Sequence, residues 1–109
     1  MSKKEKIKSY KKVRDRIREE TFKYTDMFHC NGCDTDKHKD LWVLDHVYKR
    51  SGSMYFYDKP INLYPLCSDC NIQREIQGDE YLKCFNEYQE IKQKLRDIEN
   101  NLTLTEKKE

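Results

Sequence analysis

The segment INLYPLCSDCNIQR, residues 61–74, decides the fold, because it carries two cysteines where an apolar stretch gives way to a polar one. The apolar part leads into a short helix, which we expect to begin near Cys67 and to end around Gly78. Cys67 and Cys70 are separated by two residues, so that one tight turn can present both sulfur atoms to a metal ion. Their position near a helix N-terminus also favours the thiolate form.

A second pair with the same spacing, Cys30 and Cys33, occurs earlier in the chain. Two such pairs can supply four thiolates to one tetrahedral zinc ion, provided that the intervening residues fold so that the pairs meet. The alternative is that these thiols are redox-active. We expect a structural zinc ion, because such an ion would stabilise a domain with a small core.

The composition is that of a small domain that needs extra stabilisation from a metal ion, a disulfide or a partner subunit. The chain has 109 residues, of which 36% are hydrophobic and 39% charged. No apolar segment follows the charged N-terminus and no run is long enough to span a bilayer, so we expect no membrane partner and a cytoplasmic location. Thiols stay reduced in the cytoplasm, which favours metal binding over disulfides. The fifth cysteine, Cys84, is expected to be a core residue.

The hydrophobic pattern divides the chain into four parts. These are a basic N-terminal helix (1–24), a zinc domain (25–78), a C-terminal amphipathic helix (79–102) and a frayed tail (103–109). Within the zinc domain, we interpret residues 28–40 as a turn-rich loop and LWVLDHV, residues 41–47, as a buried strand. We expect the apolar stripe of the last helix to pack within the chain. A coiled-coil dimer is the alternative, so the sequence leaves monomer and homodimer open.

The charges are distributed unevenly along the chain. Residues 1–20 hold nine Lys and Arg against four Asp and Glu, a balance of +5, and the remainder holds 13 against 16, a balance of −3. A basic arm on a slightly acidic body indicates a polyanionic partner. A solvated helix surface is the alternative explanation.

Three motifs occur in a fixed order: the first cysteine pair, then LDHV (residues 44–47), then the segment 61–74. This ordered set resembles the HNH endonuclease family, in the subgroup with a four-cysteine zinc site and a final asparagine, and the match runs from Cys30 to about Arg74. The resemblance implies an α+β fold with a small ββα-metal, treble-clef-like core, a structural zinc ion and flanking helices. It also implies a stand-alone protein of phage type.

The resemblance assigns a role to each matching position. His46 corresponds to the general base that activates water, which suits a side chain with a pKa near neutrality. Asn62 corresponds to the residue that orients the histidine or its loop. Asp45 and Asn71 correspond to ligands of a catalytic divalent ion, Mg²⁺ or Mn²⁺. The remaining matches are basic residues that would contact phosphate: Lys49, Arg50 and Arg74.

Helix geometry allows Cys70 and Asn71 to serve different sites. Successive helix residues point about 100° apart, so the cysteines can face zinc while Asn71 turns toward the strand that carries Asp45 and His46. The chain departs from the family at Lys49, where many members have proline, and in having one glycine, Gly52, where two are common.

The expected function is divalent-metal-dependent hydrolysis of DNA phosphodiester bonds. Two alternatives remain: a zinc-stapled nucleic-acid-binding module without catalysis, and a junction-resolving nuclease that acts as a dimer. Some phage members of the family work beside the DNA-packaging terminase, which makes terminase a further candidate partner.

Overall fold

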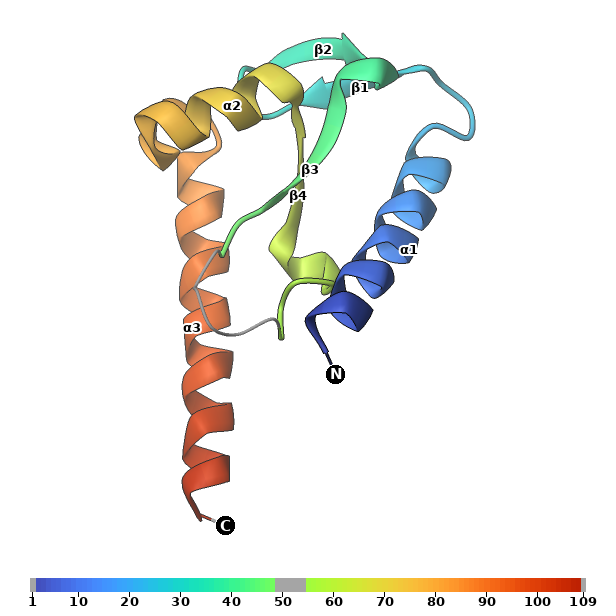
Figure 1. The fold of residues 1–109 in the computed structure, drawn as a ribbon. Coiled ribbons are helices and arrows are strands. Elements are labelled where there is room, and N and C mark those ends of the chain that lie inside the picture. Colours follow the sequence, from blue (N-terminus) through green and yellow to red (C-terminus); the bar gives the residue numbers. More distant parts are fainter. Residues whose placement is uncertain (1, 49–54, 109) are drawn as a thin grey trace.

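The fold is α+β, as expected, and the computed structural model describes residues 2–48 and 55–108, with side chains up to Asn101. Within this part of the chain, three α-helices accompany two small antiparallel sheets (Figure 1). The elements are α1 (Lys3–Thr21), β1 (Met27–Cys30), β2 (Thr35–His38), β3 (Trp42–His46), β4 (Leu63–Cys67), α2 (Ser68–Gln77) and α3 (Phe85–Lys108).

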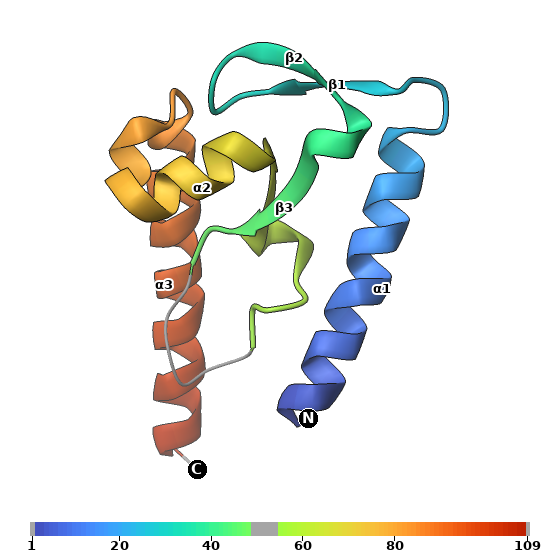
Figure 2. The same ribbon diagram turned by 45° about the horizontal axis from the view of Figure 1, so that its top comes forward.

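The strands β3 and β4 and the helix α2 form the centre of the molecule. β3 lies within the strand predicted at residues 41–47 and pairs with β4 so that Asp45 faces Tyr64 and His46 faces Leu63. Helix α2 follows β4 directly, with Cys67 as its N-cap residue. α1 and α3 lie on opposite sides of this strand–strand–helix unit (Figures 1 and 2).

The first cysteine pair lies on a β-hairpin, where the sequence predicted a loop. β1 and β2 pair from Met27 opposite His38 to Cys30 opposite Thr35. The turn between them closes through a bond from the Asp34 N–H to the Cys30 carbonyl at 2.7 Å, with Asp34 in the left-handed region at φ 57°. β1 alternates exposed and buried side chains over only four residues, and β2 has no buried side chain, so the apolar pattern is too short to identify a strand.

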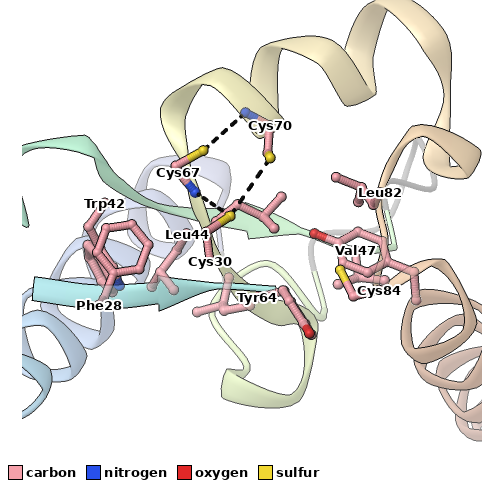
Figure 3. Packing of buried hydrophobic residues seen from close by; sticks show 13 residues of the cluster. Phe28, Cys30, Trp42, Leu44, Val47, Tyr64, Cys67, Cys70, Leu82 and Cys84 are labelled. Carbon is pink, nitrogen blue, oxygen red and sulfur yellow. Dashed lines mark hydrogen bonds between the residues drawn. The ribbon is translucent and has the colours of Figure 1, made fainter. Parts of the chain in front are cut away.

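The core is one cluster of apolar and cysteine side chains (Figure 3). Aromatic side chains close the end of this cluster near α1, where Phe22 contacts both Phe28 and Trp42 edge-on, with ring centroids 6.0 and 5.9 Å apart. At the other end, Leu82, Cys84 and Tyr88 are buried, which confirms that Cys84 is a core residue.

The two flanking helices pack on the central unit through their apolar faces. None of the residues of α1 is fully buried, but Tyr10, Val13 and Ile17 contact the core cluster. α1 ends at Thr21, a few residues earlier than expected.

The last helix begins at Phe85, later than expected, because the chain first forms a short 3-10 turn over Asp79–Tyr81. Tyr88 and Leu95 are fully buried, so this part of the apolar stripe packs within the chain, as expected, whereas Tyr81 and Ile98 are exposed. The helix continues to Lys108, through residues expected to be frayed. Within the described part of the chain, no helix has the length and apolar character needed to cross a membrane.

Candidate metal centre and adjoining histidine site

Four cysteine sulfur atoms lie together where the β1–β2 hairpin meets the start of α2. The Sγ atoms of Cys30, Cys33, Cys67 and Cys70 all lie within 4.8 Å of one another. Those of Cys30 and Cys70 are 3.8 Å apart (Figure 3). This separation matches the edge of a tetrahedron with metal–sulfur bonds of about 2.3 Å. The predicted cysteine cluster is therefore present, and it could hold a metal ion.

Backbone N–H groups orient the sulfur atoms of this cluster. The Cys67 N–H donates to Cys30 Sγ at 3.3 Å, and the Cys70 N–H donates to Cys67 Sγ at 3.5 Å. Such bonds stabilise thiolates, which are the form that binds metal.

Gly32 allows the hairpin turn to approach the second cysteine pair closely. A Cβ atom at this position would lie 3.1 Å from Cys70 Sγ and 3.0 Å from Leu66. Glycine therefore fits here because a side chain would push the two halves of the cluster apart.

Cys33 differs from Cys67 and Cys70 in its affinity for protons. Burial would raise the pKa of Cys33, but a hydrogen bond with Thr35 and bonds with the neighbouring sulfurs outweigh it and lower this pKa to about 7. Burial raises the pKa of Cys67 and Cys70, and the nearby Cys30 adds to the increase for both. A bound cation would be needed to hold all four as thiolates, because their mutual repulsion opposes ionisation.

His46 lies at the end of β3 and is held by an adjoining turn, Tyr55–Asp58. Its Nε2 lies 2.9 Å from the carbonyl oxygen of Tyr57. Because a carbonyl can only accept a hydrogen bond, Nε2 carries a proton, and in the neutral ring Nδ1 is the basic nitrogen. The ring of Tyr57 stacks on that of His46 at 4.4 Å, and Tyr10 packs against it at 4.8 Å. This side chain is thus oriented by a carbonyl and two rings.

Asn62 joins the chain segments on either side of residues 49–54. Its Oδ1 accepts from the Tyr48 N–H at 2.7 Å, and its Nδ2 donates to the carbonyls of Tyr48 at 3.3 Å and Phe56 at 3.2 Å. Its own carbonyl accepts from the Val47 N–H at 2.9 Å. All these bonds lie within two residues of His46 or of Tyr57, so Asn62 occupies the place of a residue that holds the histidine loop.

Asp45 does not form a ready-made site for a divalent ion. Its carboxylate is 3% exposed, and Oδ2 accepts from Arg74 Nη1 at 2.6 Å and from the Tyr88 hydroxyl at 2.8 Å. Burial raises the pKa of Tyr88, and the charge of Asp45 raises it further, so this hydroxyl remains a donor. Among the described residues, the four cysteines are the one group of three or more His, Cys, Asp or Glu that could hold a metal ion.

Arg74 is placed differently from the phosphate contact that the sequence predicted. Its side chain is 6% exposed, and Nη1 and Nη2 also donate to the carbonyls of His46 and Val47, at 3.1 and 2.9 Å. Its Nε donates to Asp79 at 2.6 Å. All three guanidinium nitrogens are therefore bonded inside the protein, and this corrects the expected role of Arg74.

The other predicted site residues are less informative. Asn71 follows Cys70 in the first turn of α2 and is half-buried. Lys49 and Arg50 lie outside the described residues. Sequence reasoning missed Tyr57, whose main-chain carbonyl carries no sequence signal. Tyr10 and Tyr88 were visible only as members of helical apolar stripes.

We compared the chain with models of protein families, with curated proteins and with solved structures, and none of them matches it.

Proposed function

We propose that this protein is an HNH-type endonuclease that hydrolyses phosphodiester bonds in DNA, with His46 as its general base. The observation that carries this proposal is the arrangement of His46 and Asn62 at the end of β3. The histidine is oriented through Nε2 by the Tyr57 carbonyl, and the asparagine holds the chain on both sides of the adjoining loop. This combination suits proton transfer better than it suits packing alone.

His46 would remove a proton from the attacking water through Nδ1, the basic nitrogen of the neutral ring. The unperturbed pKa of histidine, about 6.5, allows this near neutral pH. As the ring gains a proton, its Nε2–H bond to the Tyr57 carbonyl strengthens, because the donor becomes positively charged. General-base catalysis of this kind typically contributes ~10²- to 10⁴-fold.

We assign zinc to the four-cysteine cluster. Four thiolate donors in a tetrahedral arrangement without an open position are typical of structural zinc rather than catalytic zinc. The ion would join the hairpin to β4 and α2, and so stabilise the β3–β4 sheet, in which β3 ends at His46 and β4 follows Asn62.

We include Mg²⁺ or Mn²⁺ as a cofactor of the reaction, since phosphate transfer needs positive charge beside the phosphate. Asp45 and Asn71 offer oxygen ligands of the preferred kind. The bonds from Arg74 and Tyr88 to Asp45 Oδ2 do not fit this role, so we assign the ion no geometry.

The proposed substrate is DNA because of the charge on α1. The exposed basic residues of this helix include Lys4, Lys8, Lys11, Lys12 and Arg16. Such a surface would bind the phosphate backbone in a salt-dependent and largely sequence-independent way. A phage setting and a terminase partner are proposals from the family resemblance alone, and a cytoplasmic location is a proposal from the sequence.

A second candidate function is a zinc-stapled DNA-binding module without catalysis. The engagement of Asp45 by Arg74 and Tyr88 favours this candidate, because a binding module needs no second metal ion. The basic face of α1 would serve either function.

Cleavage of supercoiled plasmid separates the two. The wild type is compared with His46→Ala in Mg²⁺, Mn²⁺ or EDTA, after zinc content and helix content show that both are folded. His38→Ala is the matched control, because His38 is exposed and lies outside the site. Metal-dependent nicking that His46→Ala loses and His38→Ala keeps supports the nuclease. DNA binding without cleavage by the zinc-loaded wild type supports the binding module.

A further inference from the structure

Two tyrosine rings from distant parts of the chain meet at the imidazole of His46. The ring of Tyr57 is nearly parallel to the imidazole, at an interplanar angle of 20°. Tyr10, from α1, contacts the imidazole at 46° and meets the edge of Tyr57, with their centroids 5.1 Å apart. A helix that the sequence suggested only as a DNA contact therefore forms one wall of the histidine site.

The turn that carries the Tyr57 carbonyl is also tied to α1. Asp58 accepts from Lys6 Nζ at 3.0 Å and from Ser9 Oγ at 2.6 Å, and Lys6 donates to the Tyr55 carbonyl at 3.3 Å. Burial would raise the pKa of Asp58, but the bonds from Ser9 and Lys6 outweigh it and lower this pKa. Asp58 is thus a buried carboxylate held by two donors on one helix.

These contacts hold the Tyr57 carbonyl from two directions. Asn62 bonds to Phe56 on one side of Tyr57, and α1 bonds to Asp58 on the other. The turn lies outside both sheets, so strand pairing does not fix its position. If the contacts with α1 were lost, the carbonyl could move away from His46 Nε2, and the ring could then adopt the other tautomer.

We infer that α1 is a positioning element for His46, in which Lys6, Ser9 and Tyr10 fix the Tyr55–Asp58 turn and thereby the Nε2–H tautomer of the imidazole. The consequence for catalysis rests on the proposed function. The tautomer itself does not rest on the proposed function, because it is a property of the folded protein without DNA.

Two lysines of α1 provide a matched test. Lys6 contacts the turn and Lys8 is exposed, so Lys6→Met and Lys8→Met remove the same charge, but only the first breaks the contact. Tyr10→Ala removes the ring, Tyr10→Phe keeps it, and Tyr24→Ala is a control at an exposed tyrosine. The readout is the pair of imidazole ¹⁵N shifts of His46, measured at a pH where the ring is neutral, in zinc-loaded protein.

We expect the wild type, Lys8→Met, Tyr10→Phe and Tyr24→Ala to show the proton on Nε2. Lys6→Met and Tyr10→Ala should show a mixture of tautomers, together with a fall in kcat of ~10- to 100-fold, since small displacements of a catalytic group have effects of this size. KM should rise more in Lys8→Met than in Lys6→Met, because Lys8 lies on the exposed basic face of α1 whereas Lys6 is paired with Asp58.

The outcomes distinguish this inference from the proposed function. If Lys6→Met and Tyr10→Ala keep the ¹⁵N shifts of the wild type, the positioning role is wrong, whether or not DNA is cleaved. If the shifts change in these two variants while the wild type cleaves no DNA, the positioning role stands and the nuclease does not. If Tyr10→Ala fails to fold, Lys6→Met still decides the question, with Lys8→Met as its control.

Discussion

Arg74 and Asp45 form an ion pair in the interior, with Nη1 and Oδ2 separated by 2.6 Å and with side chains 6% and 2% exposed. The pair connects α2 to β3, and Tyr88 of α3 donates to the same carboxylate oxygen. Arg74 also forms an ion pair with Asp79, which in turn pairs with Lys92 of α3. One buried network thus joins three elements of the fold.

Loss of the arginine should destabilise the protein strongly. Arg74→Met leaves the Asp45 charge buried with one donor fewer, so we expect the free energy of unfolding to fall by ~3–5 kcal/mol. Urea denaturation of the zinc-loaded protein measures this change. Arg96→Met, at an exposed position of α3, is the control and should change stability by less than about 0.5 kcal/mol. A similar small change for Arg74→Met would mean that the network contributes nothing.

The same network makes the free energy of unfolding depend on pH in the acid range. Burial would raise the pKa of Asp79, but the bonds from Lys92 and Arg74 outweigh it, and the folded-state pKa lies below the usual value. The stability from Asp79 is therefore fully present above the unfolded pKa of about 3.9 and is lost as the pH falls through the folded value.

Asp79→Asn should remove that part of the acid dependence. Urea midpoints of the wild type and of Asp79→Asn, measured from neutral pH down through the aspartate range, should converge as the pH falls. Asp97→Asn changes an exposed aspartate on α3 and is the control. Its urea midpoints should run parallel to those of the wild type as the pH falls. If the urea midpoints of Asp79→Asn also run parallel to those of the wild type, Asp79 does not contribute to the acid dependence. Loss of zinc at low pH affects all three proteins alike.

Removal of the metal should unfold much of the structure. A chelator strong enough to extract zinc should abolish cooperative thermal unfolding, because the four clustered sulfurs then lack a shared cation and the core is small. Circular dichroism and metal analysis measure this, and Zn²⁺ but not Mg²⁺ should restore the fold. Cys70→Ser should lose the metal, whereas Cys84→Ala, a change at a buried cysteine outside the cluster, should keep it. Retention of zinc by Cys70→Ser would contradict the assignment of Cys70 as a zinc ligand.

Asn62 should affect both stability and activity. Asn62→Ala leaves the backbone groups of Tyr48 and Phe56 without the bonds that the amide makes, which should destabilise by ~1–3 kcal/mol. Because the same bonds hold the loop beside His46, cleavage should fall further than the loss of folded protein explains. Asn86→Ala, at an exposed position of α3, provides the reference for both assays. Unchanged activity per folded molecule would limit Asn62 to a structural role.

The sequence predicted the features that have strong local patterns. Two short cysteine spacings required the chain to bring residues 30–33 and 67–70 together, and the structure does so. The segment at residues 41–47 marked β3, since it combines β-branched and aromatic residues in a short, mostly apolar run. Helical apolar spacing marked α1 to within a few residues at each end, whereas α3 begins at Phe85 and ends at Lys108, where the sequence predicted residues 79–102.

The sequence did not predict features that depend on tertiary contacts. The β1–β2 hairpin is held by backbone pairing and by the sulfur cluster, while most of its side chains face solvent. Arg74 looked like a surface cation because its buried partner Asp45 lies 29 positions earlier in the chain. The Tyr57 carbonyl is a backbone group, and every residue has one.

The closure made by Asn62 has a consequence for how this protein can diversify. A single side chain joins Tyr48 to Phe56, and its bonds run to backbone groups, which every residue has. The closure therefore depends on the identity of position 62 and not on the side chains at the two positions that it joins. Selection for a fixed histidine at position 46 would act on the asparagine itself.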